Sequence, residues 1–241
     1  MTANKLVVSD NVTQLLAEAS NRWFECATRA IEQRGSFNVA LAGGSTPENL
    51  YKKLAADARL NALWPKTSLY FGDERCVAPE HADSNYAMVK RSLLDNISGE
   101  PPQCFRMEGE RSPQDAASSY VKLLANNLPH VETFPVFDLI LLGMGTDGHT
   151  ASLFPDTEGL KNIHDSVIAN HIPQLDTWRI TLTFPTLLHA RDIMILVTGL
   201  AKADVIHDIL HNEEANYPIK NLLSHATLVW LLDSEAASKT G

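Results

Sequence analysis

The sequence predicts an α/β domain with a mainly parallel sheet flanked by helices. Short apolar segments alternate along the chain with longer segments of helical periodicity, and this alternation is typical of βαβ units. Residues 136–142 are apolar except for Asp138, as expected of a central strand that helices cover on both faces. No repeat, linker or low-complexity segment divides the chain, so we expect one domain over residues 1–241.

In the first half of the chain, a short strand precedes a long amphipathic helix. Leu15 and Trp23 recur on one face of this helix, and Gly35 ends it. Two later helices open after polar residues, one after Asp83 and one after Ser112, where a proline fills the first turn. The expected elements are strands over 5–8, 37–41 and 68–71, and helices over 11–33, 47–58, 84–94 and 113–126.

In the second half, residues 178–184 alternate apolar and polar side chains with a period of two. Arg179, Thr181 and Thr183 therefore share one face of a strand, opposite an apolar set. The other elements expected here are strands over 136–142, 192–197 and 228–232, and helices over 201–210 and 218–223.

Charge, hydropathy and cysteine content exclude several classes of function. The 20 Lys and Arg against 29 Asp and Glu give a net charge of -9, which has the wrong sign for binding nucleic acid or an acidic membrane. The longest apolar runs are five residues, whereas a membrane span needs about 20. Residues 1–20 show no secretory signal, and the three cysteines fit a reducing compartment. We therefore expect a cytoplasmic protein.

A di-glycine turn follows the expected strand over residues 37–41. Gly43 and Gly44 lead into a helix start at which either Ser45 or Thr46 could cap. Glycines let backbone N–H groups point inward at the positive end of a helix, where a phosphate is favoured. A tight turn that binds nothing is the alternative. Ser45 as an acyl-enzyme nucleophile is disfavoured, because the Gly-x-Ser-x-Gly elbow is absent.

Two further loops follow strands at the edge where open α/β sheets bind ligands. The first carries Asp73 and Arg75, although consecutive charges are often only a solvated turn. The second contains three glycines within residues 143–148 and presents Asp147 and His149. An imidazole, with a usual pKa of about 6.5, suits proton transfer near neutral pH. A histidine that merely caps or packs the loop is the alternative.

Two other groups of residues are weaker candidates. Lys202 lies where a helix opens after a strand, so its ammonium could reach the same sheet edge, or it could be a surface residue. His207 and His211 have the i, i+4 spacing of metal ligands, but no third ligand is evident. We interpret them as a solvated helix face and expect no metal.

Five blocks of sequence, taken in order, resemble the 6-phosphogluconolactonase family of the glucosamine-6-phosphate deaminase superfamily. The resemblance spans nearly the whole chain and implies a single Rossmann-like domain that hydrolyses 6-phospho-D-glucono-1,5-lactone in the oxidative pentose phosphate pathway. It implies no cofactor. The blocks are residues 41–47, residues 72–75 with 83–86, residues 143–155, residues 179–183 and residues 199–203.

The deaminases of the same superfamily are the main alternative, because they share the glycine turn and residues like Asp73, Asp147 and His149. Two departures favour the lactonases. Phe154 occupies the place of a deaminase glutamate, and Arg75 that of a tyrosine. A non-catalytic sugar-phosphate sensor would need the phosphate site but no base, so the presence of His149 beside Asp147 argues against it.

The resemblance leads to a hypothesis for the site. His149 acts as the general base on water, and Asp147 orients or polarises it. Asp73 belongs to the substrate-binding residues, and the phosphate binds among the backbone amides of residues 43–46 and three cationic side chains, Arg75, Arg179 and Lys202. The expected partner is a small sugar-phosphate lactone, with no nucleic acid and no membrane, and the protein is expected to be a monomer or small homo-oligomer.

Overall fold

The computed structural model describes residues 5–240. A seven-stranded sheet forms its centre, and every adjacent pair of strands in it is parallel. The predicted α/β class with a mainly parallel sheet is therefore confirmed. In spatial order the strands are β1 (Lys5–Ser9), β12 (Leu228–Asp233), β11 (Ile193–Val197), β8 (Leu139–Leu142), β2 (Phe37–Leu41), β3 (Thr67–Phe71) and β5 (Gln103–Cys104).

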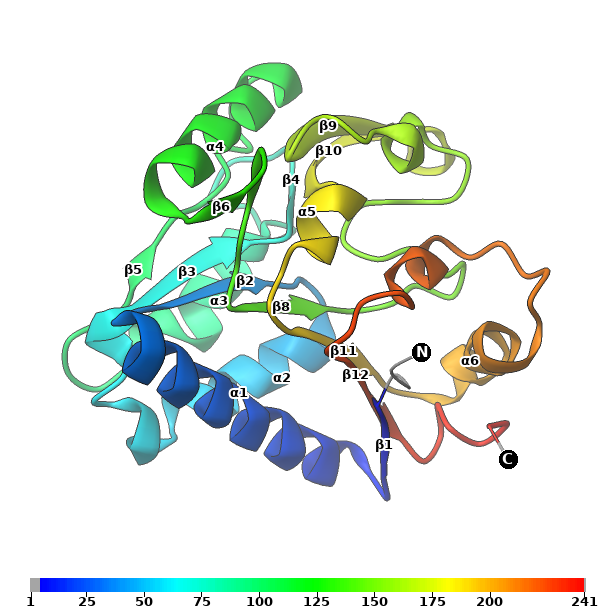
Figure 1. Ribbon diagram of the computed structural model, residues 1–241, viewed down its shortest axis with the longest axis horizontal. Coiled ribbons are helices and arrows are strands. Elements are labelled where there is room, and N and C mark those ends of the chain that lie inside the picture. The colour runs from blue at the N-terminus through cyan, green and yellow to red at the C-terminus, as the bar shows by residue number, and fades with distance from the viewer. Residues whose placement is uncertain (1–4, 241) are drawn as a thin grey trace.

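Helices cover both faces of this sheet (Figure 1). Helices α1 and α2 lie on one face, and α4 lies on the other. The helices are α1 (Val12–Arg34), α2 (Ser45–Ala55), α3 (Asn85–Ser92), α4 (Pro113–Asn127), α5 (Phe184–Leu188) and α6 (Ala203–His211). Short 3₁₀ turns are η1 (Ala58–Leu60), η2 (Trp64–Lys66), η3 (Leu94–Asn96), η4 (Glu158–Lys161), η5 (Pro173–Leu175), η6 (Leu200–Lys202) and η7 (Pro218–Leu222). None of the helices described is both long and apolar enough to span a membrane.

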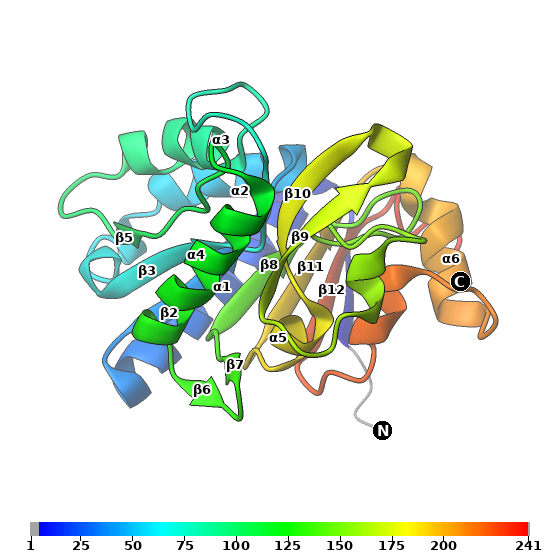
Figure 2. The same cartoon turned by 90° about the horizontal axis from the view of Figure 1, so that it is seen from above.

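A second, antiparallel sheet was not predicted. It consists of β4 (Asp73–Arg75), β10 (Thr177–Leu182) and β9 (Val167–Ile172), in that order. Figure 2 shows β9 and β10 above the central strands of the large sheet. The alternation in residues 178–184 correctly indicated a strand but could not indicate its partners. A small hairpin of β6 (His130–Val131) and β7 (Phe134–Pro135) completes the strands of residues 5–240.

Two helix ends agree with the sequence and two do not. Gly35 ends α1 with a left-handed φ of 81°, and Ser112 caps α4, which has Pro113 in its first turn. The expected cap of α2 by Ser45 or Thr46 is wrong: the helix begins at Ser45, and Gly44, with φ 102°, is the cap and supplies no side chain. Ser84, rather than Asp83, caps α3 through a bond from the Ala87 N–H.

The strand expected over residues 136–142 starts later, at Leu139. The carboxylate of Asp138 accepts a hydrogen bond from the Asn38 backbone N–H at 2.8 Å and ion pairs with Arg34 and Arg191, at 2.9 and 3.4 Å. The residue just before β8 therefore binds its neighbours through its side chain. This cluster joins α1, β2 and the loop before β11 at the amino ends of the central strands.

The order of the strands determines where a ligand can bind. From β2 the chain proceeds outward through β3 and β5, and then it returns to β8 and proceeds through β11 and β12 in the opposite direction. The loops after β2 and β8 therefore diverge at the carboxyl ends of two adjacent strands. Such a switch point leaves a crevice in open α/β sheets, and ligands bind there.

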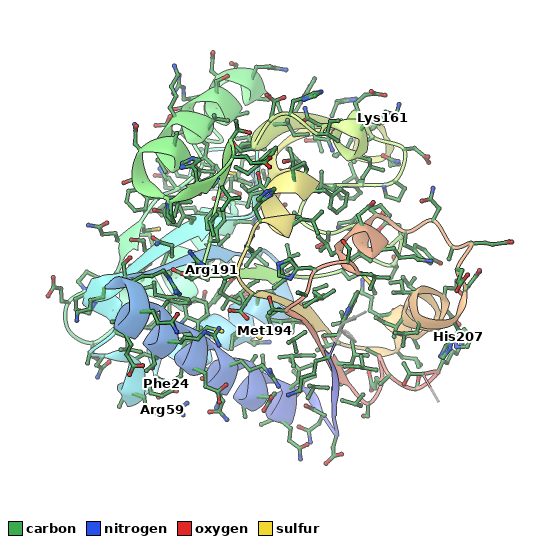
Figure 3. The ribbon with its side chains drawn as sticks, in the orientation of Figure 1. Phe24, Arg59, Lys161, Arg191, Met194 and His207 are labelled. Atoms are coloured by element: carbon green, nitrogen blue, oxygen red, sulfur yellow. The ribbon has the colours of Figure 1, made fainter. Side chains whose placement is uncertain are left out.

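We predict that Asp138→Ala lowers the free energy of unfolding by about 2–3 kcal/mol, because it removes charged hydrogen bonds and leaves the half-buried Asn38 N–H without its acceptor. Urea unfolding measures this loss. Lys161→Ala is the control, since Lys161 lies at the periphery (Figure 3) and, among the described residues, forms an ion pair only with the exposed Glu158. Its effect should stay below about 0.5 kcal/mol. Equal effects of the two variants would contradict the role of Asp138.

Candidate active site

A cavity of about 360 Å³ lies at the switch point, between strand β4 and the loops that follow β2, β8 and β11. Most of the side chains and glycines predicted from the sequence line it. Asp147 and Arg179 do not line it, but Asp147 contacts the lining residue His149, and Arg179 pairs in register with the lining residue Arg75. The predicted residues in the lining are Gly43, Gly44, Ser45, Thr46, Asp73, Arg75, His149 and Lys202.

One end of the cavity is suited to an anion. The N-terminus of α2 opens there, and no side chain caps it, so the first N–H groups at Ser45 and Thr46 remain available. The Thr46 hydroxyl lies 2.7 Å from the hydroxyl of Thr198, which also lines the cavity. Lys202 faces the same space, and within residues 5–240 it forms no ion pair. Burial lowers the pKa of Lys202, and the charge of Asp147 partly opposes this shift.

Two arginines occupy neighbouring positions in the small sheet. Arg75 of β4 pairs in register with Arg179 of β10, and Asp73 pairs with Thr181. Because every second residue of a strand faces the same side, these four residues share one face. Burial, and then the charge of Arg75, lower the pKa of Arg179. The charges of Asp73 and Asp83 oppose this shift only in part. Two like charges held side by side favour binding of an anion.

Asp73 is held in position by hydrogen bonds on both carboxylate oxygens. The Ser152 hydroxyl donates to one at 2.6 Å, and the Asn85 amide donates to the other at 3.2 Å. Asn85 also packs against Gly43, where a Cβ would lie only 2.2 Å from its side-chain oxygen. The di-glycine turn, α3 and the small sheet are therefore joined at Asp73, which is 8% exposed.

Glu74 fixes the start of α3 from the other side of β4. Its carboxylate accepts the backbone N–H groups of Asn85 and Tyr86, at 2.7 and 2.8 Å, and the Ser84 hydroxyl at 3.1 Å. Burial raises the pKa of Glu74, although the hydrogen bonds from the backbone N–H groups lower it in part. The carboxylate thus occupies the positive end of a helix and holds Asn85 beside Asp73.

His149 lines the cavity and is paired with a carboxylate, Asp147, that lies outside the lining. His149 Nδ1 lies 2.6 Å from Asp147 Oδ1, which also accepts the His149 backbone N–H at 3.2 Å. Burial alone would raise the pKa of Asp147, but the backbone hydrogen bond and the attraction of His149 lower it overall. A neutral imidazole that donates Nδ1–H to this carboxylate keeps a lone pair on Nε2, for which the described residues supply no partner.

Glycines make this loop possible. At Gly145 a Cβ would lie 2.1 Å from His149 Nδ1 and 2.4 Å from Asp147 Oδ1, so a side chain there would displace the pair. Gly148 has a left-handed φ of 73°, and a Cβ there would meet the Tyr217 ring at 2.5 Å. The Thr150 hydroxyl donates to the Gly143 carbonyl at 2.9 Å and closes the loop.

His207 and His211 lie on the exposed face of α6, and their ring centroids are 4.9 Å apart. His207 Nδ1 contacts the carbonyl of Lys239 at 2.7 Å. Within residues 5–240, no group of three or more His, Cys, Asp or Glu side chains is placed to hold a metal ion. His207 is at the periphery in Figure 3.

The sequence interpretation missed Thr198 and gave no role to Asn85 or Ser152. Thr198 directly follows β11, so the rule that ligands bind at the carboxyl ends of strands could have found it. No local pattern marks Asn85 or Ser152. Both act through Asp73, and that contact depends on tertiary structure.

Fold and site together define an α/β protein whose switch-point cavity combines an uncapped helix N-terminus with an imidazole that is paired with a carboxylate. The family described as glucosamine-6-phosphate isomerases/6-phosphogluconolactonase matches residues 10–230, and the chain belongs to it. The chain is 36% identical to a 6-phosphogluconolactonase from Chlamydia pneumoniae, in an alignment that covers 97% of this chain and 89% of the relative. It is 38% identical to a 6-phosphogluconolactonase from Synechocystis sp., in an alignment that covers 87% of each chain.

Solved structures agree with this assignment. The structure of 6-phosphogluconolactonase from Trypanosoma brucei superposes with a TM-score of 0.88 at 31% identity, covering 100% of both chains. A monomeric glucosamine-6-phosphate deaminase superposes with a TM-score of 0.80 at 21% identity, and this likeness concerns the fold alone.

We predict that Gly145→Ala breaks the contact between His149 and Asp147, because the added methyl group would occupy the space of the Nδ1 atom. Nitrogen NMR of the imidazole reports this change through the Nδ1 proton. Gly143→Ala is the matched control in the same loop, where a Cβ would meet nothing within 4 Å. An unchanged His149 spectrum in Gly145→Ala would contradict the geometry.

Proposed function

We propose that this chain hydrolyses 6-phospho-D-glucono-1,5-lactone to 6-phospho-D-gluconate, a step of the oxidative pentose phosphate pathway. The observation that carries the proposal is that His149, which is paired with Asp147, and the open N-terminus of α2 line one cavity. Membership of the family and the names of relatives that align over most of the chain support it.

In this proposal the phosphate is held at a distance from the reacting carbonyl. Its charge of about -1.5 to -2 at pH 7 binds the amides at residues 43–46 together with Lys202, Arg75 and Arg179. Asp73, held by its two hydrogen bonds, accepts hydroxyl groups of the sugar. Anchoring the remote phosphate orients the lactone carbonyl against His149, so that binding energy contributes to catalysis.

His149 then acts twice. Nε2 takes a proton from a water molecule as the water oxygen attacks the lactone carbonyl carbon and a tetrahedral intermediate forms. When the bond between this carbon and the ring oxygen breaks, the same nitrogen returns the proton to the ring oxygen. Asp147 keeps the proton on Nδ1 throughout and stabilises the transient imidazolium.

We also propose that residues 1–241 act as one domain in the cytoplasm, as a monomer or small homo-oligomer without a cofactor. The step above uses only water and side chains of this chain. The net charge of -9 argues against nucleic acid as a partner.

The direct test is an assay of the purified chain with the phosphorylated lactone and, in parallel, with glucosamine 6-phosphate and ammonia detection. We expect rapid lactone hydrolysis and no ammonia. Ammonia release would point to the deaminase reaction, and loss of both reactions with retained sugar-phosphate binding would point to a sensor.

In the same assay, His149→Ala should lower kcat by about two to four decades, the usual contribution of a general base. Circular dichroism should show an intact fold. His207→Ala, which removes an exposed imidazole from α6, is the control and should keep full activity. Near-normal turnover of His149→Ala would remove His149 from the role of base.

Arg75→Ala should chiefly raise KM, roughly tenfold or more, with a smaller loss of kcat, because a charged contact to the substrate is lost. Steady-state kinetics separates the two constants. Arg111→Ala is the matched control, since Arg111 is exposed and pairs with Glu108 away from the cavity. If neither constant changes in Arg75→Ala, Arg75 does not bind the substrate.

A further inference from the structure

The ring of Phe154 stacks on the imidazole of His149. The ring centroids are 3.8 Å apart and the planes differ by 16°. A tight turn makes this contact possible: Leu153 donates its N–H to the Thr150 carbonyl at 3.0 Å, and the chain reverses direction between His149 and Phe154. The hydroxyl of the buried Thr157 donates a hydrogen bond to the Phe154 carbonyl at 2.8 Å and so holds the backbone at Phe154 in place.

Phe154 is not a core residue. Among the described residues it belongs neither to the buried hydrophobic cluster nor to the partly buried side chains that pack against it, whereas its neighbour Leu153 is fully buried. The side chain remains partly exposed. A partly exposed ring that stacks on one imidazole outside the core adds little to core packing, so stability alone does not explain its position.

The hydrogen bond to Asp147 holds the imidazole at one atom, Nδ1, and does not by itself fix the orientation of the ring. A ring held at Nδ1 alone can pivot about that contact, and the pivot would swing Nε2 away from the cavity. Gly145 closes the space beside Nδ1 and Cε1. Phe154 covers a face of the ring, so that pivoting toward that face would drive the two rings into each other.

We propose that Phe154 is a positioning residue, whose stacked ring holds the His149 imidazole with Nε2 aimed at the substrate. This inference rests on the proposed lactonase function and deepens it. Phe154 contacts the base and not the reacting atoms, so it acts on turnover and hardly on binding of the phosphate end. Misplacing a catalytic group by about 1 Å can cost up to a hundredfold in rate.

The test compares three variants with the wild type. Phe154→Leu keeps an apolar side chain but removes the flat ring, and Phe154→Tyr restores the ring. Phe24→Leu is the matched control: Phe24 lies on α1, where the Arg59 guanidinium covers its ring at 4.9 Å, distant from the cavity (Figure 3). The measurements are kcat and KM for the lactone, the melting temperature, and the proton NMR shifts of the His149 ring.

We expect Phe154→Leu to lower kcat about tenfold or more, with KM changed less than about twofold and an unchanged melting temperature. Phe154→Tyr should recover most of the loss, and Phe24→Leu should turn over normally. The His149 ring protons should lose an upfield ring-current shift in Phe154→Leu only.

Three kinds of result would overturn the inference. If the wild type hydrolyses the lactone and Phe154→Leu is equally active, the stacked ring does not position His149, and the lactonase function is unaffected. A fall in kcat that Tyr does not restore, or that follows a lower melting temperature, would assign Phe154 a structural role. A wild type without lactonase activity would instead overturn the proposed function, and with it this inference.

Discussion

The parallel pairing of β2 with β8 is the constraint on which the rest of the site depends. Val39 pairs with Leu139 and Ala40 with Ile140, so both strands end at one edge of the sheet. The di-glycine turn follows one strand and the imidazole loop follows the other. Because the chain leaves these two strands toward opposite edges of the sheet, a cavity remains between their loops. Residues 43–46 of one loop and His149 of the other line it.

The small antiparallel sheet supplies what the large sheet lacks. It carries Arg75 and Arg179 side by side, in a chain whose net charge is -9, and so concentrates positive charge where the overall field is negative. It also ties the two loops together, because Thr181 accepts the Ser152 N–H at 3.2 Å and Ser152 holds Asp73. The positive charge at the site is thus local, in a chain whose net charge is negative.

The sequence was sufficient for features that depend on local pattern or on strand ends. Periodicity predicted the parallel sheet and α1, and the strand-end rule predicted the placement of Gly43, Asp73 and His149. The sequence was insufficient for features that depend on contacts between segments far apart in the chain. The second sheet depends on pairing between segments far apart in the chain, and Gly44 displaced the expected caps because its φ of 102° starts α2 without a side chain. The stack of Phe154 on His149 likewise exists only after the turn at residues 150–153 has formed.

The central claim is that one cavity holds the phosphate at α2 and presents the sugar carbonyl to His149. A crystal structure with 6-phosphogluconate tests it most directly. The account predicts the phosphate within hydrogen-bond distance of the amides at residues 44–46, and the carboxylate within about 3.2 Å of His149 Nε2. A phosphate bound elsewhere, or a carboxylate turned away from the imidazole, would contradict it.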